Sequence, residues 1–410
     1  MTGPRAGSPS IAEALEHLRG DFPALSGRVW LNNGVVSLTP LPVTQYLVSL
    51  FEEILQHGPP HVTRPTVEDP RRLESLQTIA GLLGCDSDDI ALMRGVTEAY
   101  LTVLRGIDWR AGDEILLSAD EEMALQLPAW HLRDSLGVVV KTFPLFDDEE
   151  RQMAAINGLV GPRTRLLAFS HVTTDLGHRL PVAAICRMAR AREILTFVDT
   201  AHTLGVVPVN LDAWGPDFAG AVSYKWTYGP YGCGVLFAKQ SSVQRIHLRY
   251  AGNRSELGFD YADESYRLRE TAGRFQSGPW SWTLVHAWAY AIRYLQQIGL
   301  DLIYQRTAFL TGRVKAALSG APGVEVLTPL DPQHSAALVA IAVPRVEQDA
   351  LARLLRERWN IDVRELLGRK RGIRASISFF NTEEEVDLLV EAVQAIAEEG
   401  SRNALPTNSA

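Results

Sequence analysis

From about residue 88 onward, short apolar runs alternate along the chain with longer amphipathic stretches. The runs have the length and the β-branched content of strands, and seven of them precede residue 240: 89–95, 114–119, 138–144, 164–171, 195–201, 220–225 and 232–239. Helix-length segments such as 96–107 and 181–192 separate the earlier runs. This alternation predicts an α/β fold with a mostly parallel seven-stranded sheet that helices cover on both faces.

The seventh run differs from the others in its connection. The turn YGPYG, residues 228–232, joins it to the sixth run. A turn of this length cannot hold a helical crossover, so we expect the seventh strand to pair antiparallel with the sixth.

The pattern changes after residue 280. A long amphipathic helix at 283–299 is followed by strands at 324–329, 335–344 and 372–378 and by helices at 348–358 and 383–399. We therefore expect a large domain over 30–280 and a small α+β domain over 281–400, with a ligand-binding cleft between them. Residues 1–29, with a helix at 11–22, are expected to pack on the small domain, and residues 401–410 to form a disordered tail.

The composition is that of an ordinary globular protein. Of the 410 residues, 46% are hydrophobic and 21% are charged, and the formal net charge of −8 argues against nucleic-acid binding. The cysteines Cys85, Cys186 and Cys233 lack metal-ligand spacing, which predicts no metal site and a reducing, cytoplasmic location. No apolar run is long enough to span a bilayer, and the first ten residues lack a signal-peptide core, so we expect no membrane association.

Three side chains that can carry chemistry lie at the ends of neighbouring runs. Asp199 lies near the end of the fifth run, His202 follows three residues later, and Lys225 ends the sixth run between Tyr224 and Trp226. Taken singly, Asp199 is explained as a helix N-cap, His202 as a packed histidine and Lys225 as a solvated lysine. Ligands of open α/β sheets bind beyond the carboxyl ends of strands. The convergence of the three residues there favours a site with a desolvated, nucleophilic Lys225.

The segment RGVTEAY, residues 94–100, joins a strand to a helix. Backbone N–H groups at a helix start bind phosphate, and Gly95 permits close approach to Val96 and Thr97 in the first turn. The segment is not a P-loop, because the GK[ST] ending is missing, and it is a weak signal on its own. An anion site here, an acid at Asp199 and an amine at Lys225 together fit pyridoxal phosphate (PLP), which has a phosphate, a ring nitrogen and an aldehyde.

Segments from residue 22 to residue 396 follow one known pattern: VWLNNGVVSLTP, RGVTEAY, GDEILLS, SHVTTDLGHRLPV, VDTAHTLG, SYKWTYGPYGCG and IRASISFFNTEEEVD. Together they resemble the class V aminotransferase family of fold type I PLP-dependent enzymes, which includes cysteine desulfurases and isopenicillin N epimerase. The resemblance implies the fold type I architecture, PLP as cofactor, an amino-acid substrate and a homodimer.

The resemblance also implies roles for single residues at the cofactor. Lys225 forms the Schiff base with the cofactor aldehyde, Asp199 pairs with the pyridine nitrogen, and His202 neighbours the ring hydroxyl. Gly95, Val96 and Thr97 contact the phosphate.

Two further residues are implied to bind the substrate. Arg374, in the IRAS segment, matches the arginine that grips the substrate carboxylate, a task suited to a bidentate guanidinium. Its alternative role is a surface salt bridge. Asn33, in the segment VWLNNG, is likewise assigned to the substrate.

Several departures from the family pattern bear on the chemistry. Desulfurases carry a sulfur-accepting cysteine shortly before the IRAS segment, and residues 363–372 contain none. The residue that stacks on the cofactor ring is usually histidine or another aromatic. Here Glu122 or Met123 takes that place, and we predict Met123, whose thioether can lie on a ring.

Other departures lie close to the lysine. Ser223 or Tyr224 is expected to reach the phosphate, with Tyr224 standing where the family commonly has histidine. Thr174 takes a position beside the cofactor ring where asparagine is frequent. The spacing of KWTYGP, one residue longer than the desulfurase pattern, favours the epimerase side of the family.

These features predict a lyase that releases a thiol by C–S β-elimination from a cysteine conjugate, rather than a persulfide-forming desulfurase. The alternatives are an epimerase, an aminotransferase or a decarboxylating deaminase that acts on a specialised amino acid. A PLP-binding protein without catalysis is the third alternative. The motifs do not decide which bond at Cα breaks.

Overall fold

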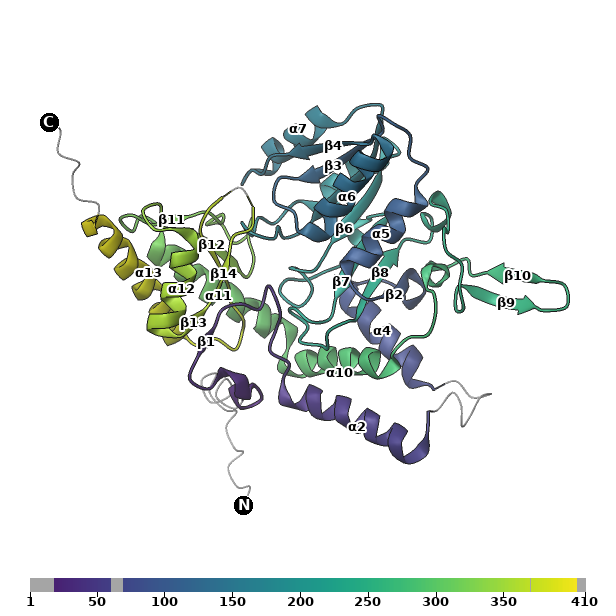
Figure 1. Ribbon diagram of the computed structural model, residues 1–410, viewed down its shortest axis with the longest axis horizontal. Coiled ribbons are helices and arrows are strands. Elements are labelled where there is room, and N and C mark those ends of the chain that lie inside the picture. Colours follow the sequence, from purple (N-terminus) through teal and green to yellow (C-terminus); the bar gives the residue numbers. More distant parts are fainter. Residues whose placement is uncertain (1–17, 60–68, 369, 404–410) are drawn as a thin grey trace, which may run out of the picture.

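The computed structural model describes residues 18–59, 69–368 and 370–403. A seven-stranded sheet of order β2-β8-β7-β6-β5-β3-β4 forms its centre (Figure 1). Its strands are β2 (Ile90–Met93), β3 (Glu114–Ser118), β4 (Val139–Phe143), β5 (Thr164–Ser170), β6 (Leu195–Asp199), β7 (Phe218–Val222) and β8 (Gly234–Ala238). Within this sheet β8 runs antiparallel to both of its neighbours, β7 and β2. The predicted α/β class, mostly parallel sheet and antiparallel seventh strand are confirmed.

Helices bury both faces of this sheet. Every residue of β3, β6, β7 and β8 is buried, as consecutive apolar positions require. One face packs on α4 (Arg71–Leu83), α8 (Val182–Arg190) and α10 (Trp282–Ile298), and the other on α5 (Val96–Gly106) and α6 (Met123–Leu136). This packing holds the strand ends rigidly, which fixes the side chains placed there. Two further helices, α7 (Glu149–Leu159) and α9 (Leu211–Trp214), follow β4 and β6.

A second, smaller unit lies at the left of Figure 1. Its sheet has the order β11-β12-β15-β14, with β11 (Glu325–Val326), β12 (Leu338–Ala342), β14 (Arg364–Glu365) and β15 (Ile373–Ser376). Three helices share a hydrophobic core with it: α11 (Leu300–Leu318), α12 (Gln348–Trp359) and α13 (Glu383–Asn403). This antiparallel sheet delivers β14 and β15 to the boundary with the large sheet.

The described part of the N-terminal segment packs on this smaller unit. Phe22 lies in one apolar cluster with Phe379 and Phe380, and Arg19 pairs with Glu385. The strand β1 (Val29–Trp30) then pairs in parallel with β13 (Ile361–Asp362). Of the helix predicted at 11–22, residues 18–20 are helical, and residues 11–17 lie outside the described part.

Helix α10 packs on the large sheet, although the sequence pattern assigns residues from 281 to the small domain. Val285, Trp288 and Ile292 are buried in the core of the large sheet. The helix also lies against α2 (Leu41–His57) and α4. Its periodicity shows that one face is buried but not against which partner, and this is why sequence alone misplaces it. At the other end, residues 401–403 of the expected tail continue α13, and residues 404–410 lie outside the described part.

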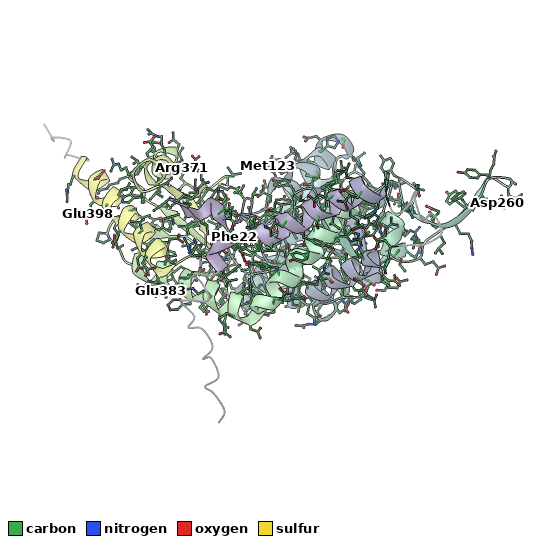
Figure 2. All side chains as sticks on the ribbon, turned by 90° about the horizontal axis from the view of Figure 1, so that it is seen from below. Phe22, Met123, Asp260, Arg371, Glu383 and Glu398 are labelled. Carbon is green, nitrogen blue, oxygen red and sulfur yellow. The ribbon has the colours of Figure 1, made fainter. Side chains whose placement is uncertain are left out.

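A hairpin of β9 (Glu256–Asp260) and β10 (Ser265–Leu268) projects from the large domain (Figures 1 and 2). The sequence analysis does not predict it, because its strands are exposed and carry no buried run. Leu257, Phe259, Tyr261 and Tyr266 are exposed on it. Within the described residues, no helix is both long enough and apolar enough to cross a membrane.

Candidate functional site

A cavity of about 870 Å³ opens beyond the carboxyl ends of the central strands. The loop after β2, the start of α6, the end of β6 and the segment after β7 form its wall, and Arg364 of β14 reaches it from the smaller unit. Gly34 closes the same wall from the N-terminal segment. The cavity therefore lies where open α/β sheets bind ligands and is bordered by both domains.

Lys225 stands three residues after β7 and lines this pocket as a buried side chain. Its Nζ lies 3.3 Å from Nε2 of His202. Burial lowers the pKa of Lys225 to about 8, although the charges of Asp199 and Glu122 act to raise it. The amine is thus desolvated, as its aromatic sequence neighbours predict.

Asp199 is the last residue of β6 and is buried against the pocket. The backbone N–H of Ala201 donates to its Oδ1 at 2.7 Å, and no hydrogen bond from the described residues reaches Oδ2. Burial raises the pKa of Asp199 to about 6, and Lys225 acts to lower it. One oxygen therefore serves the local backbone, as an N-cap would, while the other is left for a cationic ligand.

His202 and Thr174 lie beside Lys225. The Nε2 of His202 is 3.4 Å from Oγ1 of Thr174, while its buried Nδ1 has no partner among the described residues. Burial, then the positive charges of Lys225 and Arg374, hold the pKa of His202 well below its usual range, so the ring is neutral. A neutral ring with an unpartnered nitrogen is suited to contact a bound aromatic ligand.

The start of α5, the predicted phosphate site, lines one end of the pocket. Gly95 is its N-cap and Val96 and Thr97 are its first residues, so their N–H groups have no intrahelical acceptor. The loop lies directly on the sheet, since a Cβ at Gly234 would stand 2.8 Å from the Cα of Gly95. A glycine at position 234 is therefore required for the start of α5 to sit at this depth.

Arg374 of β15, the predicted carboxylate-binding residue, lies against Thr174. Its side chain is fully buried, and its Nη1 donates to the backbone carbonyl of Thr174. Nε and Nη2 have no partner among the described residues, and a Cβ at Gly34 would stand 2.8 Å from Nη2. Burial, then the charge of Arg364, lowers the pKa of Arg374 to about 9. Two unpartnered donors of one guanidinium make a fork for a carboxylate, which excludes the surface salt-bridge alternative.

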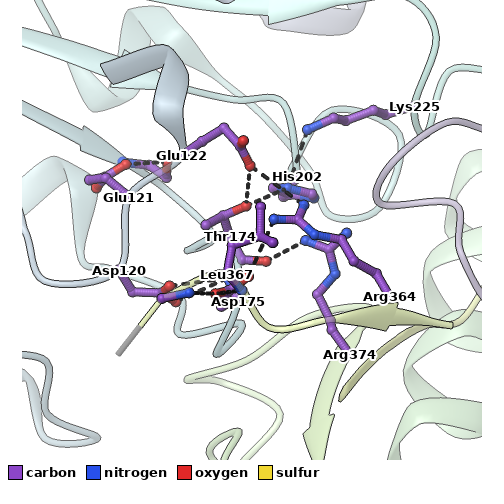
Figure 3. Close-up of polar contacts among 12 residues, drawn as sticks. Asp120, Glu121, Glu122, Thr174, Asp175, His202, Lys225, Arg364, Leu367 and Arg374 are labelled. Carbon is purple, nitrogen blue, oxygen red and sulfur yellow. Dashed lines mark hydrogen bonds and ion pairs between the residues drawn. The ribbon is translucent and has the colours of Figure 1, made fainter. Parts of the chain in front are cut away.

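Arg364 is a charged residue of the pocket that the sequence analysis does not place there, and Glu122, its alternative to Met123 at the cofactor ring, lines the pocket as well (Figure 3). Arg364 lies directly opposite Arg374 in the β14–β15 ladder. Its guanidinium is 3.6 Å from Glu122 and 3.6 Å from Asp175, so two carboxylates offset the repulsion between the arginines. The pairing of β14 with β15 would have revealed Arg364. The sequence predicts β15 as the strand at 372–378, but the two-residue β14 leaves no periodic signal.

Known proteins resemble this chain along most of its length. Residues 37–389 match the family model for class-V aminotransferases. The chain belongs to the class-V aminotransferase family. It is 30% identical to isopenicillin N epimerase of Streptomyces clavuligerus over 92% of this chain and 99% of that protein. It is 27% identical to a probable cysteine desulfurase of Methanothermobacter thermautotrophicus over 93% and 98% of the two chains.

Solved structures share the fold of this family member. A lysine-to-alanine mutant of C-DES, with glycine covalently linked to its PLP cofactor, superposes with a TM-score of 0.83 at 24% identity, covering 92% of this chain and 98% of that chain. The predicted family, fold class and cofactor are confirmed: this chain is a PLP-dependent enzyme of fold type I.

The pocket residues fit PLP in chemical type. Asp199 offers a carboxylate oxygen, His202 a neutral ring, the start of α5 an anion site and Lys225 a buried amine, and all four line or border one cavity. Arg374 adds a fork for an amino-acid carboxylate. Their individual roles stay predictions. Asp199, Lys225 and the start of α5 line the pocket, whereas His202 contacts Lys225 and Arg374 contacts Thr174.

The remaining predicted site residues differ in how they relate to the pocket. Ser223 does not line it, because its hydroxyl donates to the carbonyls of Pro230 and Cys233, so the predicted phosphate contact is not supported. Met123 lines the pocket and is 49% exposed, and Tyr224 lines it while stacked on Tyr231.

Asn33 is buried beside the pocket. Its Oδ1 accepts a hydrogen bond from Trp30 at 3.1 Å, whereas its Nδ2 has no partner among the described residues. One donor is therefore left for a ligand, and the predicted substrate contact stays open to test.

The lowered pKa of Lys225 predicts how PLP loading depends on pH. Only the neutral amine attacks an aldehyde, and with a pKa of about 8 its neutral fraction rises as the pH increases through that value. The rate constant for loading the PLP-free protein is expected to rise from pH 7 to about 9 and then level off, followed by visible absorbance in stopped flow. A rate that keeps climbing toward pH 10.5 would show an ordinary, solvated lysine.

Proposed function

We propose that this enzyme is a lyase that cleaves the C–S bond of a cysteine conjugate by β-elimination. The observation that supports this most directly concerns thiols. Within the described residues, none of Cys85, Cys186 and Cys233 lines the pocket. Burial raises the pKa of Cys85, Cys186 and Cys233, so none is a ready thiolate. A persulfide-forming desulfurase needs an acceptor thiol at the pocket, whereas a lyase releases the sulfur with its substituent.

The residues of the pocket divide the work of such an elimination. Arg374 binds the substrate carboxylate through Nε and Nη2 and so orients the bonds at Cα. Bound PLP supplies the electron sink for the bond that breaks at Cα. Asp199 is ionised and buried, and its negative charge stabilises a positive charge on the group that it faces. The side chains of Asp199, Lys225 and Arg374 are buried, and the low dielectric around buried groups strengthens these interactions.

Lys225 then moves the protons. Its neutral amine takes the proton from Cα, the Cβ–S bond breaks, and the electron pair of that bond leaves on sulfur. The sulfur departs as a thiol after taking up one proton, and the remaining aminoacrylate hydrolyses to pyruvate and ammonia. A pKa of about 8 lets Lys225 accept and release this proton near neutral pH.

Epimerisation is the second candidate, because the chain is 30% identical to an isopenicillin N epimerase over 92% of its length. It shares the first step, proton removal from Cα, and differs in returning the proton to the opposite face. An aminotransferase or a decarboxylating deaminase stays a further alternative, with amino-acid substrates in each case. The homodimer and the cytoplasmic location implied by the family resemblance also stay predictions, the first open to light scattering.

A product panel separates these reactions. Purified holoenzyme is incubated with neutral S-alkyl cysteine conjugates, and thiol, pyruvate, ammonia and CO2 are quantified. We expect thiol, pyruvate and ammonia in equal amounts and no CO2. Release of CO2 without thiol would overturn the lyase, and loss of optical activity with intact conjugate would establish the epimerase.

A further inference from the structure

Glu122 is a pocket carboxylate to which the proposed chemistry gives no task. It precedes α6 as the N-cap residue, but its side chain does not cap the helix. Instead its Oε2 accepts a hydrogen bond from Oγ1 of Thr174 at 2.8 Å and lies 3.6 Å from Arg364. Both contacts use Oε2, and no hydrogen bond from the described residues reaches Oε1. The side chain is 27% exposed and lines the cavity, which leaves Oε1 available to a ligand.

Thr174 fixes the position of Glu122 relative to the substrate. Its backbone carbonyl accepts from Arg374, and its hydroxyl donates to Glu122 (Figure 3). The guanidinium of Arg374 and the carboxylate of Glu122 therefore contact the same residue, Thr174. On the proposed function, a substrate held at Arg374 with its Cα at Lys225 has its side chain in the cavity that Glu122 lines.

Glu122 and Arg364 both line the cavity, and a second carboxylate, the buried Asp175, lies against Arg364. Arg364 is the cation nearest to Glu122, yet it lies between Glu122 and Asp175, 3.6 Å from each. Two carboxylates share one guanidinium, and both distances exceed that of a direct hydrogen bond. Burial acts to raise the pKa of Glu122, but Lys225 and the hydrogen bond from Thr174 lower it below its ordinary value, so the carboxylate is ionised at neutral pH. On the proposed function the α-carboxylate of the substrate occupies Arg374, which leaves the ionised Glu122 to meet the side chain.

We infer that Glu122 determines substrate specificity and selects cysteine conjugates whose sulfur substituent ends in a cationic group, such as an ammonium. This inference rests on the proposed function for the identity of the conjugate. Opposite charges on a ligand and its pocket give specificity as a difference of affinities, and a like charge there is penalised. Conjugates with an acidic substituent are therefore disfavoured, and neutral ones bind with intermediate affinity.

Three near-isosteric probes test the inference: S-aminoethyl-, S-propyl- and S-carboxymethyl-L-cysteine. Their dissociation constants are measured by calorimetry on Lys225→Ala protein saturated with PLP, in which no turnover disturbs the equilibrium. We expect the aminoethyl probe to bind at least tenfold more tightly than the carboxymethyl probe. In the Lys225→Ala protein that also carries Glu122→Gln, this ratio is expected to fall below about threefold. An unchanged ratio overturns the inference.

Two further variants control for folding and for general charge. Glu122→Asp keeps the carboxylate and is expected to retain the preference for the aminoethyl probe. Glu365→Gln removes a charge from the neighbouring position of β14, whose side chain points to the other face of the strand from Arg364, and is expected to leave the ratio unchanged. Loss of the preference in Glu365→Gln, or in Glu122→Asp with PLP still bound, contradicts the inference.

Different results would contradict the lyase proposal and the specificity role of Glu122. If wild-type holoenzyme releases no thiol from any of the three probes, the lyase proposal is wrong, while the affinity ratio still reports on Glu122. If thiol is released but the ratio does not depend on Glu122, the lyase stands and the specificity role does not.

Discussion

Replacing Lys225 by alanine is expected to reduce thiol release from a cysteine conjugate by at least about 10³-fold, because one amine acts both as cofactor attachment and as proton acceptor. The variant is also expected to lose the visible absorbance of PLP bound to the lysine, measured on purified protein after removal of unbound PLP. Both losses follow from the same atom, the buried Nζ that lies 3.3 Å from His202.

The control for this variant is Lys239→Ala. Lys239 follows β8, lies outside the pocket and is partly exposed, so its removal tests the loss of one positive charge elsewhere on the same sheet. We expect the control to keep its absorbance and more than half of its activity. Retention of the lysine-bound PLP absorbance in Lys225→Ala would show that another amine holds the cofactor.

The large domain could be predicted from sequence because its signal is local. Strands such as β3 and β6 are buried at every position, so each appears in the sequence as a continuous apolar run that periodicity detects. The same local logic placed Asp199 and Lys225 at strand ends. The exposed hairpin β9–β10 has no such run, and its strands are determined by pairing with each other rather than by a buried face.

Contacts between distant parts of the chain bring together the residues on the substrate side of the site. A local sequence pattern cannot reveal such contacts. Thr174 and Arg374 are 200 positions apart in the chain, yet the carbonyl of one accepts from the guanidinium of the other. Arg364 reaches the pocket only because β14 pairs with β15 in one register. Sequence alone also could not decide whether Glu122 or Met123 faces the polar cluster, since the backbone at the start of α6 sets that direction. The positions of these residues at the site can be recognised only in the folded structure, in which the two sheets lie against each other.

Part of the segment before the IRAS motif is held against the large domain by hydrogen bonds, and no cysteine takes part in these bonds. The backbone N–H groups of Leu367 and Gly368 both donate to Oδ2 of Asp175, at 2.7 and 2.6 Å. Asp120 in turn accepts from the N–H groups of Asp175 and Leu176. Leu367 and Gly368 are thus held against the large domain, close in sequence to Arg364, which lines the pocket.

The Arg374→Ala variant is expected to raise KM for amino-acid substrates by about 10²-fold while PLP binding stays within about twofold of wild type. Arg374 presents two unpartnered buried donors, Nε and Nη2, and a hydrogen bond to a charged group contributes roughly 1.5–3 kcal/mol. Two such bonds correspond to roughly one hundredfold or more in affinity, since every 1.4 kcal/mol is about tenfold. Steady-state kinetics and PLP titration of the same preparation measure both quantities.

Two variants show whether this effect comes from the fork or from charge alone. Arg374→Lys keeps a positive charge but cannot offer two parallel donors, so we expect it to recover only part of the lost affinity. Arg371→Ala removes an exposed arginine three positions away, whose ion pair with Glu347 spans 3.8 Å, and is expected to leave KM unchanged. Because the fork is buried and adjoins Gly34, a bulky residue at position 34 should mimic Arg374→Ala: a Cβ there would stand 2.8 Å from Nη2. An unchanged KM in Arg374→Ala would assign the substrate carboxylate to Arg364 instead, the guanidinium that lies opposite it in the ladder.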